Sequence, residues 1–213
     1  MRCFIGLDLS PTEKLSLDSW RQQALPEVLP RVTEGSELSP GRRKQRRGSQ
    51  PQGPATPYAI PAANYHITLC FLGHITPSQH EQVIAALDNV ACEPFALTLD
   101  TTGIWNGPKI LFAAPTSPPP ALMQLARDSR KAARQAGIEV EGREYRPHVT
   151  LIRKAGVTLP PPLYPPDCMV SAHAFHLFES VSAPSGVTYP IRHSWPLQAA
   201  TSVREKLRRG LLD

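Results

Sequence analysis

The chain has 213 residues, 41% of them hydrophobic and 19% charged, which is enough for one large globular domain or two small ones. No apolar run approaches the roughly 20 residues that a membrane-spanning helix needs. The segment Met1–Asp8 also lacks the long apolar stretch of a secretory signal peptide. We therefore expect a cytoplasmic protein that does not associate with membranes.

The net charge of +5 comes from one short segment. Residues 42–47 contain five basic side chains, so the rest of the chain is formally neutral. This run could bind RNA phosphates without sequence specificity. No aromatic residue interrupts it to stack on bases, however, and a solvated charge run is the simpler interpretation.

Neither the cysteines nor the clustered histidines have the spacing of a metal site. The four cysteines form no Cys-x-x-Cys pair, and we interpret them as free thiols. His173 and His176 would point to opposite sides of an expected strand. A glycine-rich phosphate loop is also missing, which leaves nucleoside triphosphate hydrolysis without support. We expect no metal and no cofactor.

The chain begins with an expected strand and helix. Residues 2–9 alternate between apolar and other side chains, which predicts a strand. Ser10 as N-cap and Glu13 in a capping box predict a helix that runs to about Leu25. Residues 26–58 are rich in Pro, Gly, Ser and Gln and lack a periodic apolar pattern, so we expect a mobile, basic insertion.

The next segment, residues 65–73, predicts a strand with a chemical side and a core side. Side chains alternate along a strand, so His66 and Thr68 share one side while Ile67 and Leu69 point into the core. The segment therefore presents an imidazole and a hydroxyl together, anchored from behind by apolar residues.

The middle of the chain reads as alternating helices and strands. Thr76 opens a helix that ends near Asn89. Residues 94–100 alternate as a strand, and 104–109 read as a hairpin turn leading into a strand at 110–114.

Next come an expected helix and the strand that carries His148 and Thr150. A helix with apolar residues at helical spacing follows Pro118–Pro120 and ends at Gly137. We expect a short strand at 138–140 and then a strand on which His148 and Thr150 share one side.

The end of the chain completes the expected sheet. Residues 155–167 read as a proline-rich loop, and segments 169–181 and 188–195 as a closing pair of strands. We place one domain at residues 1–196 and a tail at 197–213, in which a short amphipathic helix begins near Ala199.

The pattern His, apolar, Thr, Leu occurs twice, at His66 and at His148. Chance would supply far less than one copy in a chain with seven histidines. One copy alone would favour an ordinary strand with a solvent-facing histidine. With two copies we expect a cleft with one histidine on each wall.

The order of elements predicts an α+β fold. Too few strand–helix–strand crossovers occur for a doubly wound parallel sheet. We expect two pseudo-symmetric lobes, each an antiparallel sheet with helices on its outer face, with the active-site cleft between the lobes.

Three segments resemble the two-histidine (2H) phosphoesterases, and most closely the bacterial RNA 2′,3′-cyclic phosphodiesterases, also called 2′-5′ RNA ligases. They are Phe4–Asp8, Asn64–Gly73 and Arg146–Arg153. The resemblance implies a metal-independent hydrolysis of ribose 2′,3′-cyclic phosphate at RNA ends or nucleotides, usually to the 2′-phosphate. The chain departs from the family at the insertion of residues 26–58, and this puts the size of the preferred RNA in doubt.

The resemblance also implies roles for individual residues. His66 would be the acid for the leaving 3′-oxygen and His148 the base for water, although the residues alone leave these two roles interchangeable. The hydroxyls of Thr68 and Thr150 can donate to the nonbridging phosphate oxygens. We expect the enzyme to be a monomer.

Two further residues enter through the resemblance, Phe71 and Arg153, each five positions after its histidine. The family uses an aromatic and an arginine there to hold the nucleoside. An odd offset points to the opposite side of a regular strand, so each needs a bulge or strand end to reach the cleft. For Phe71 a place in the core is an equal alternative.

Two alternatives from the residues remain open. The same catalytic groups could hydrolyse another cyclic phosphate, such as ADP-ribose 1″,2″-cyclic phosphate. Alternatively, the chain could be an RNA-binding or scaffolding protein that uses its basic insertion and does not turn over substrate. The intact His and Thr in both motifs count against that second alternative.

Overall fold

The computed structural model describes residues 1–26, 28–29, 56–156, 159–184 and 186–198. The basic run at 42–47, almost all of the 26–58 insertion and the tail from Ala199 lie outside the described residues. The predictions of a mobile insertion and of a helical tail are therefore untested.

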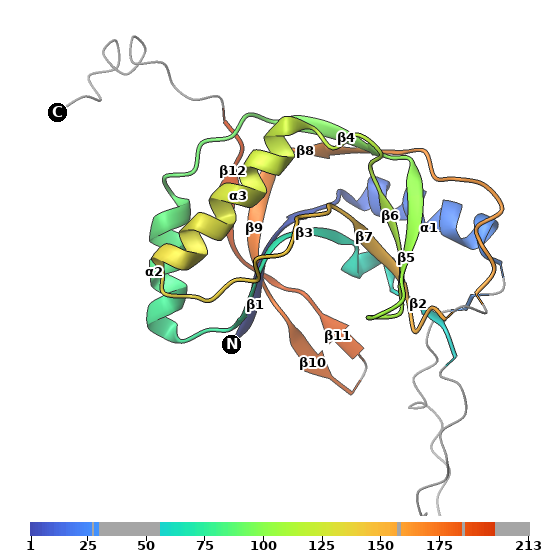
Figure 1. Cartoon of the computed structure of the whole chain (residues 1–213), viewed down its shortest axis with the longest axis horizontal. Coiled ribbons are helices and arrows are strands. Elements are labelled where there is room, and N and C mark those ends of the chain that lie inside the picture. Colours follow the sequence, from blue (N-terminus) through green and yellow to red (C-terminus); the bar gives the residue numbers. More distant parts are fainter. Residues whose placement is uncertain (27, 30–55, 157–158, 185, 199–213) are drawn as a thin grey trace, which may run out of the picture.

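An antiparallel sheet runs through the centre of the molecule (Figure 1). Its strands in spatial order are β12 (Ile191–Pro196), β9 (Ala174–Glu179), β1 (Arg2–Asp8), β3 (His66–His74), β7 (Val149–Arg153), β6 (Ile110–Ala114) and β5 (Thr101–Trp105). The short strand β2 (Tyr58–Ala59) pairs with the end of β7. Two smaller antiparallel pairs are separate: β4 (Phe95–Leu99) with β8 (Cys168–Ala172), and β10 (Val181–Ala183) with β11 (Gly186–Thr188).

The sheet has two halves that meet at the strands with the two motifs. β3 ends one half and β7 ends the other, and the register between them contains a single residue pair, Ile67 with Val149. The predicted α+β class is confirmed. The halves are nevertheless joined edge to edge in one sheet, whereas we expected a separate sheet in each lobe.

The helices cover both halves. α2 (Pro77–Leu87) packs on α3 (Pro120–Gln135), and α3 packs against β3. α1 (Pro11–Ala24) lies on the other side of Figure 1, where it contacts β8 and the 3₁₀ turn η1 (Ala62–Asn64). In that view α2 and α3 lie on one side of β3, and α1 lies on the other.

The predicted helix ends are confirmed. Ser10 and Thr76 each accept a hydrogen bond from the backbone three residues later, and both helices have complete capping boxes. Gly137 follows α3 with φ 68°, the left-handed conformation in which glycine avoids the Cβ clash of other residues. These local signals are strong because each satisfies backbone groups that a helix end leaves unpaired.

A buried polar group ties α1 to the start of β3. The hydroxyl of Tyr65, which is 1% exposed, donates to Asp18 at 3.0 Å, and Arg21 donates to the same carboxylate at 2.9 Å. Burial and the Asp18 carboxylate raise the pKa of the Tyr65 hydroxyl, so it remains a donor. The residue before His66 is therefore fixed in the core.

Two strand predictions were wrong in detail. Residues 138–140 form no strand, and Ile138 is buried in the core. The segment 169–181 is divided at His173, where the chain leaves the pair with β4 and joins the central sheet. In the segment 188–195 a break comes at Pro190, which has no N–H for a sheet hydrogen bond.

Candidate active site

The pairing of Ile67 with Val149 brings the two motifs together. Both side chains are completely buried, so both point to the same core side of the sheet. Neighbouring residues in each strand point to the opposite side. The histidine and threonine that flank each of these residues therefore lie on one shared surface.

The antiparallel register also fixes how the four groups are arranged. Continued by one residue in each direction from the Ile67–Val149 pair, it sets His66 beside Thr150 and Thr68 beside His148. The four side chains form a square, which we call the His–Thr square, with the histidines at opposite corners. We expected strands that face each other across a cleft; instead they are neighbours in one sheet.

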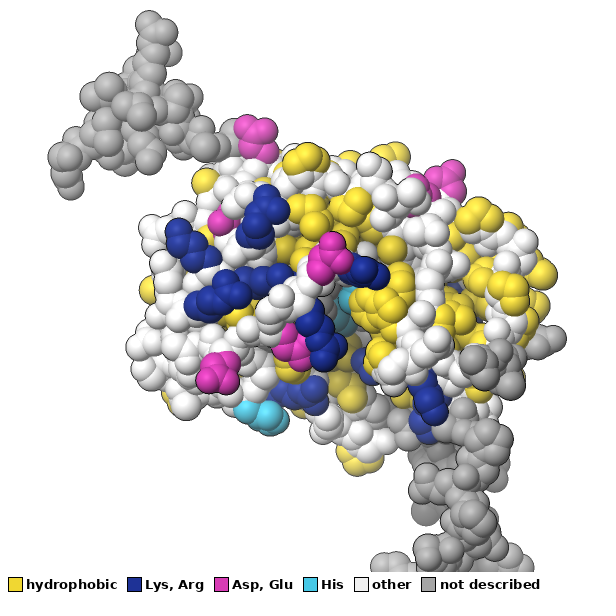
Figure 2. Space-filling model, viewed as in Figure 1, with side chains coloured by type: hydrophobic (Ala, Val, Ile, Leu, Met, Phe, Trp, Pro, Cys, Tyr) yellow, Lys and Arg dark blue, Asp and Glu magenta, His cyan; other side chains and the backbone are white. Residues whose placement is uncertain are grey.

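All six residues predicted for the site line one pocket of about 580 Å³. They are His66, Thr68, Phe71, His148, Thr150 and Arg153. Arg2 and Tyr58 line it as well, and the hairpin β10–β11 contributes residues from its inner side. Figure 2 shows a hollow in the centre of the molecule, with a histidine inside and several Lys and Arg side chains on its rim.

Phe71 and Arg153 reach this pocket because both motif strands contain an irregularity at the same place. In β3 the register with β1 passes from Thr68 to Cys70 and omits Leu69. In β7 the register with β6 passes from Thr150 to Ile152 in the same way. The extra residue reverses the alternation, so the position five after each histidine shares the histidine's side. Phe71 is 50% exposed, which argues against the core alternative.

Each histidine is oriented by a backbone carbonyl two residues before it. Nδ1 of His66 lies 2.7 Å from the oxygen of Asn64, and Nδ1 of His148 lies 2.8 Å from the oxygen of Arg146. A carbonyl oxygen only accepts, so Nδ1 donates in both rings. Nε2 of the neutral ring is then the unprotonated nitrogen, and it has no hydrogen-bond partner among the described residues.

Aromatic rings surround His66. The ring of Phe4 lies 4.7 Å from the imidazole centroid, and Tyr189 meets it edge-on at 4.8 Å. Burial is the main cause that lowers the pKa of His66 to about 4; the neighbouring His148 acts in the same direction, and the Asn64 carbonyl opposes it by favouring the charged form. His66 is therefore a neutral imidazole at neutral pH.

His148 has a matching environment. Trp105 meets its ring edge-on at 4.5 Å, and Phe112 does so at 5.5 Å. Burial lowers the pKa of His148 below its ordinary value as well. Phe112 is in turn placed by Gly103 on β5, because a Cβ there would lie 2.5 Å from the Phe112 ring.

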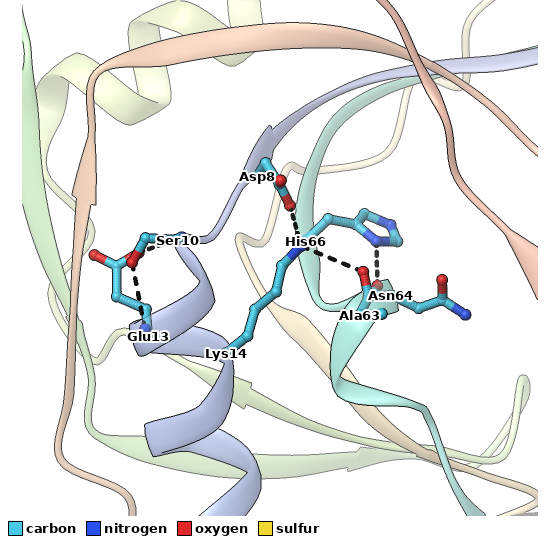
Figure 3. Close-up of polar contacts among 7 residues, drawn as sticks. All are labelled: Asp8, Ser10, Glu13, Lys14, Ala63, Asn64 and His66. Atoms are coloured by element: carbon cyan, nitrogen blue, oxygen red, sulfur yellow. Dashed lines mark hydrogen bonds and ion pairs between the residues drawn. The ribbon is translucent and has the colours of Figure 1, made fainter.

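An ion pair lies next to His66 (Figure 3). Nζ of Lys14 is 2.6 Å from Asp8 and also donates to the backbone oxygen of Ala63 at 3.2 Å. Figure 3 shows Lys14 reaching from α1 to the segment that carries Asn64 and His66. Asp8 raises the pKa of His66 and Lys14 lowers it. The two charges of this ion pair therefore shift the pKa of His66 in opposite directions.

Comparison with known proteins decides the family. The chain is similar to the RNA 2′,3′-cyclic phosphodiesterase of Escherichia coli, with 31% identity over 140 residues that cover 65% of this chain and 78% of that one. A profile of LigT-like phosphoesterases matches residues 44–111. This chain belongs to that family. The resemblance to the two-histidine phosphoesterases, found in the sequence, is thereby confirmed.

Further relatives agree with this placement in the LigT-like phosphoesterases. The RNA 2′,3′-cyclic phosphodiesterase of Bacillus subtilis is 36% identical over 96 residues, 43% of this chain and 52% of that protein. The crystal structure of E. coli LigT complexed with 3′-AMP superposes with a TM-score of 0.71 and 25% identity, covering 92% and 97% of the two chains. A further phosphoesterase crystal structure gives 0.72 with 26% identity.

Sequence reasoning missed the groups that orient the histidines. Asn64 and Arg146 hold them through backbone oxygens, which no side-chain pattern reveals. Phe4 and Phe112 come from neighbouring strands, and only the sheet order brings them to the site. Gly103 was a detectable signal, since a glycine inside a strand often marks a close approach of another group.

Two negative findings apply to the described residues only. They contain no cluster of three or more His, Cys, Asp or Glu side chains able to hold a metal ion. None of the helices among them is long and apolar enough to cross a membrane.

Proposed function

We propose that this protein hydrolyses the 2′,3′-cyclic phosphate of RNA ends or nucleotides to a phosphomonoester, without a metal ion. The observation that carries the proposal is the His–Thr square, in which two histidines offer Nε2 and two threonines offer hydroxyls to one pocket. The names of the similar E. coli and B. subtilis proteins support this substrate class. The structure of LigT with 3′-AMP supports a nucleotide-sized ligand with a ribose phosphate.

The reaction needs a base and an acid at opposite apices of the phosphorus. Nε2 of His148 takes a proton from water as the new P–O bond forms. The bond from phosphorus to the 3′-oxygen breaks, and His66 gives its Nε2 proton to that oxygen. The product is a 2′-phosphate with a free 3′-hydroxyl. Histidine suits both tasks near neutral pH.

The threonines act on the charge that develops during this displacement. The nonbridging oxygens gain negative charge in the transition state. The hydroxyls of Thr68 and Thr150 donate to these oxygens from fixed positions on the strands. Arg153 adds a positive charge in the same pocket, and Phe71 supplies an apolar surface for the nucleoside.

The acid must be protonated when the substrate is bound, although the lowered pKa of His66 makes it neutral near pH 7 without substrate. Burial keeps its pKa near 4, and a phosphate monoanion in the same pocket opposes that effect because it favours the imidazolium. Asp8 acts in the same direction. The roles of His66 as acid and His148 as base follow the resemblance to the two-histidine phosphoesterases.

The decisive experiment replaces each histidine by an isosteric amide. His66→Gln and His148→Gln should each lower kcat by roughly 10²- to 10⁴-fold, the usual share of general acid–base catalysis. His74→Gln is the matched control, because His74 ends the same strand β3 and lies outside the pocket. Activity at the wild-type level in either pocket variant would remove the assignment.

A panel of substrates separates the open alternatives. Nucleoside 2′,3′-cyclic phosphates, RNA with a 2′,3′-cyclic end and ADP-ribose 1″,2″-cyclic phosphate are compared in one assay with a chelator present. We expect turnover of the first two and no effect of the chelator. Binding of RNA without any turnover would favour the RNA-binding alternative instead.

We further propose that the protein acts as a monomer in the cytoplasm. Both histidines and both threonines come from one chain, which supports a site that is complete in a single copy. The four cysteines are free thiols, in keeping with a reducing compartment. Sedimentation of the purified full chain tests the oligomeric state.

A further inference from the structure

A second, larger cavity of about 800 Å³ adjoins the pocket of the His–Thr square. The two cavities share Thr68, Phe71 and His148, so a ligand can extend from one to the other. We call the second cavity the arginine pocket. Its side chains outside the shared ones include Trp105, Arg130, Arg143, Glu141, Glu144, Tyr145 and Arg146.

The charges of the arginine pocket leave one cation unneutralised. Arg143 pairs with Glu141 at 3.4 Å, and Arg146 pairs with Glu144 at 3.1 Å, both on the exposed rim. Within the part of the chain that the structure describes, Arg130 makes no ion pair and no hydrogen bond. The excess positive charge of the cavity is therefore located at Arg130 on α3.

The side chain of Arg130 lies against an aromatic residue. Its guanidinium is 5.6 Å from the centroid of Tyr145. The Tyr145 hydroxyl is enclosed and has no hydrogen-bond partner among the described residues. A buried polar atom of this kind points to a missing partner, which a water or a ligand can supply. A guanidinium beside an aromatic ring can bind a phosphate group that lies next to a nucleobase.

We propose that the arginine pocket binds the nucleotide that precedes the cyclic phosphate in an RNA strand, with Arg130 on its phosphodiester. This inference rests on the proposed function, because the cyclic phosphate must occupy the His–Thr square. A strand that leaves the square along Phe71 and His148 enters the arginine pocket directly. Trp105 and Tyr145 then offer aromatic surface to the base. Arg130 is thus a residue that selects RNA strands over free nucleotides.

The test compares two substrates that differ only in this preceding nucleotide. They are adenosine 2′,3′-cyclic phosphate and the dinucleotide ApA with a 2′,3′-cyclic phosphate end. The wild-type protein should give a higher kcat/KM for the dinucleotide. Arg130→Gln, which keeps part of the side-chain stem and removes the charge, should lower the dinucleotide value roughly 10- to 100-fold. It should leave the mononucleotide value unchanged.

Arg127→Gln is the matched control, because Arg127 lies on the same helix and does not line the cavity. Its side chain donates a hydrogen bond to Gln124 instead. We expect it to behave like the wild type with both substrates. Arg130→Lys keeps a positive charge but lacks the planar, bidentate guanidinium, so it should keep part of the dinucleotide preference. Circular dichroism melting confirms that each variant is folded.

A binding measurement keeps this inference separate from the catalytic proposal. Labelled ApA with a 3′-phosphate is titrated into wild type, Arg130→Gln and Arg127→Gln, and fluorescence anisotropy gives Kd. Arg130→Gln should weaken binding by a similar factor even if no substrate is turned over. Unchanged Kd and unchanged dinucleotide preference would overturn the role of Arg130. An equal loss with both substrates would overturn it too, since the mononucleotide does not reach the arginine pocket.

Discussion

His66 donates its Nδ1 hydrogen to the backbone oxygen of Asn64 at 2.7 Å, and the side-chain amide of Asn64 donates to the oxygen of Val187 at the same distance. One residue thus fixes the imidazole and also anchors the hairpin β10–β11 beside the pocket. The ring cannot turn over without breaking the first bond, so Nε2 remains the nitrogen available to the proposed substrate.

This arrangement predicts the pH dependence of the reaction. His66, the proposed acid, has a pKa of about 4, so its protonated fraction falls as pH rises above that value. Above about pH 6.5, where His148 is neutral, kcat/KM should fall by up to roughly tenfold per pH unit. Bound phosphate raises the pKa of His66, and the fall of kcat should begin at higher pH. Steady-state rates between pH 4 and 9 check both profiles; a kcat/KM that climbs steadily from pH 6 to 9 contradicts this.

Lys14 should tune the same acid. Lys14→Met leaves the Asp8 carboxylate without its 2.6 Å partner, and the pKa of His66 should rise because a lowering charge is removed. Asp8→Asn should move it in the opposite direction. NMR titration of the His66 ring protons measures both shifts. Lys131→Met, on the exposed side of α3, is the control and should leave the titration unchanged.

The threonine hydroxyls should matter for kcat more than for binding. Thr68→Val and Thr150→Val keep the size and branching of the side chain while removing the proposed donor to the phosphate. Each should lower kcat by roughly 10²-fold, in the range measured for one lost oxyanion donor. Thr98→Val, on the exposed side of β4, serves as the control. A change in KM alone would show that the hydroxyls bind the ground state only.

Gly103 should support the site from a distance. In Gly103→Ala the new Cβ would lie 2.5 Å from the Phe112 ring, so the ring must move, and Phe112 contacts His148. We expect lower kcat together with a loss of roughly 1–3 kcal/mol in the free energy of unfolding. Gly107→Ala is the matched control, since nothing lies within 4 Å of a Cβ there. Urea denaturation measures the free energy of unfolding of the two variants, and steady-state rates measure their kcat.

Local chemistry made much of the fold predictable. The capping boxes at Ser10 and Thr76 fixed two helix starts, because each side chain has one backbone group to satisfy. Burial of Ile67 and Leu69 followed from alternation on a strand. The need for a bulge before Phe71 and Arg153 also followed from alternation, and both irregularities are present.

Partner choice between strands was beyond sequence reasoning. Nothing local in the segment 169–181 indicates that its first part pairs with β4 and its second part with β1. The meeting of β3 with β7 is likewise a long-range event, and it alone determines that the histidines are diagonal neighbours. Backbone oxygens as orienting groups leave no trace in the side-chain pattern.

The diagonal placement of like groups gives the reaction centre an approximate two-fold axis through the Ile67–Val149 pair. A cyclic phosphate bound in either of two opposite orientations would meet an imidazole and a hydroxyl on each side. Under the proposed mechanism, the direction of ring opening would therefore be set by the unlike surroundings, to which Phe71 and Arg153 belong. Exchanging the chemistry of these two neighbours is then a route to the opposite regioisomer.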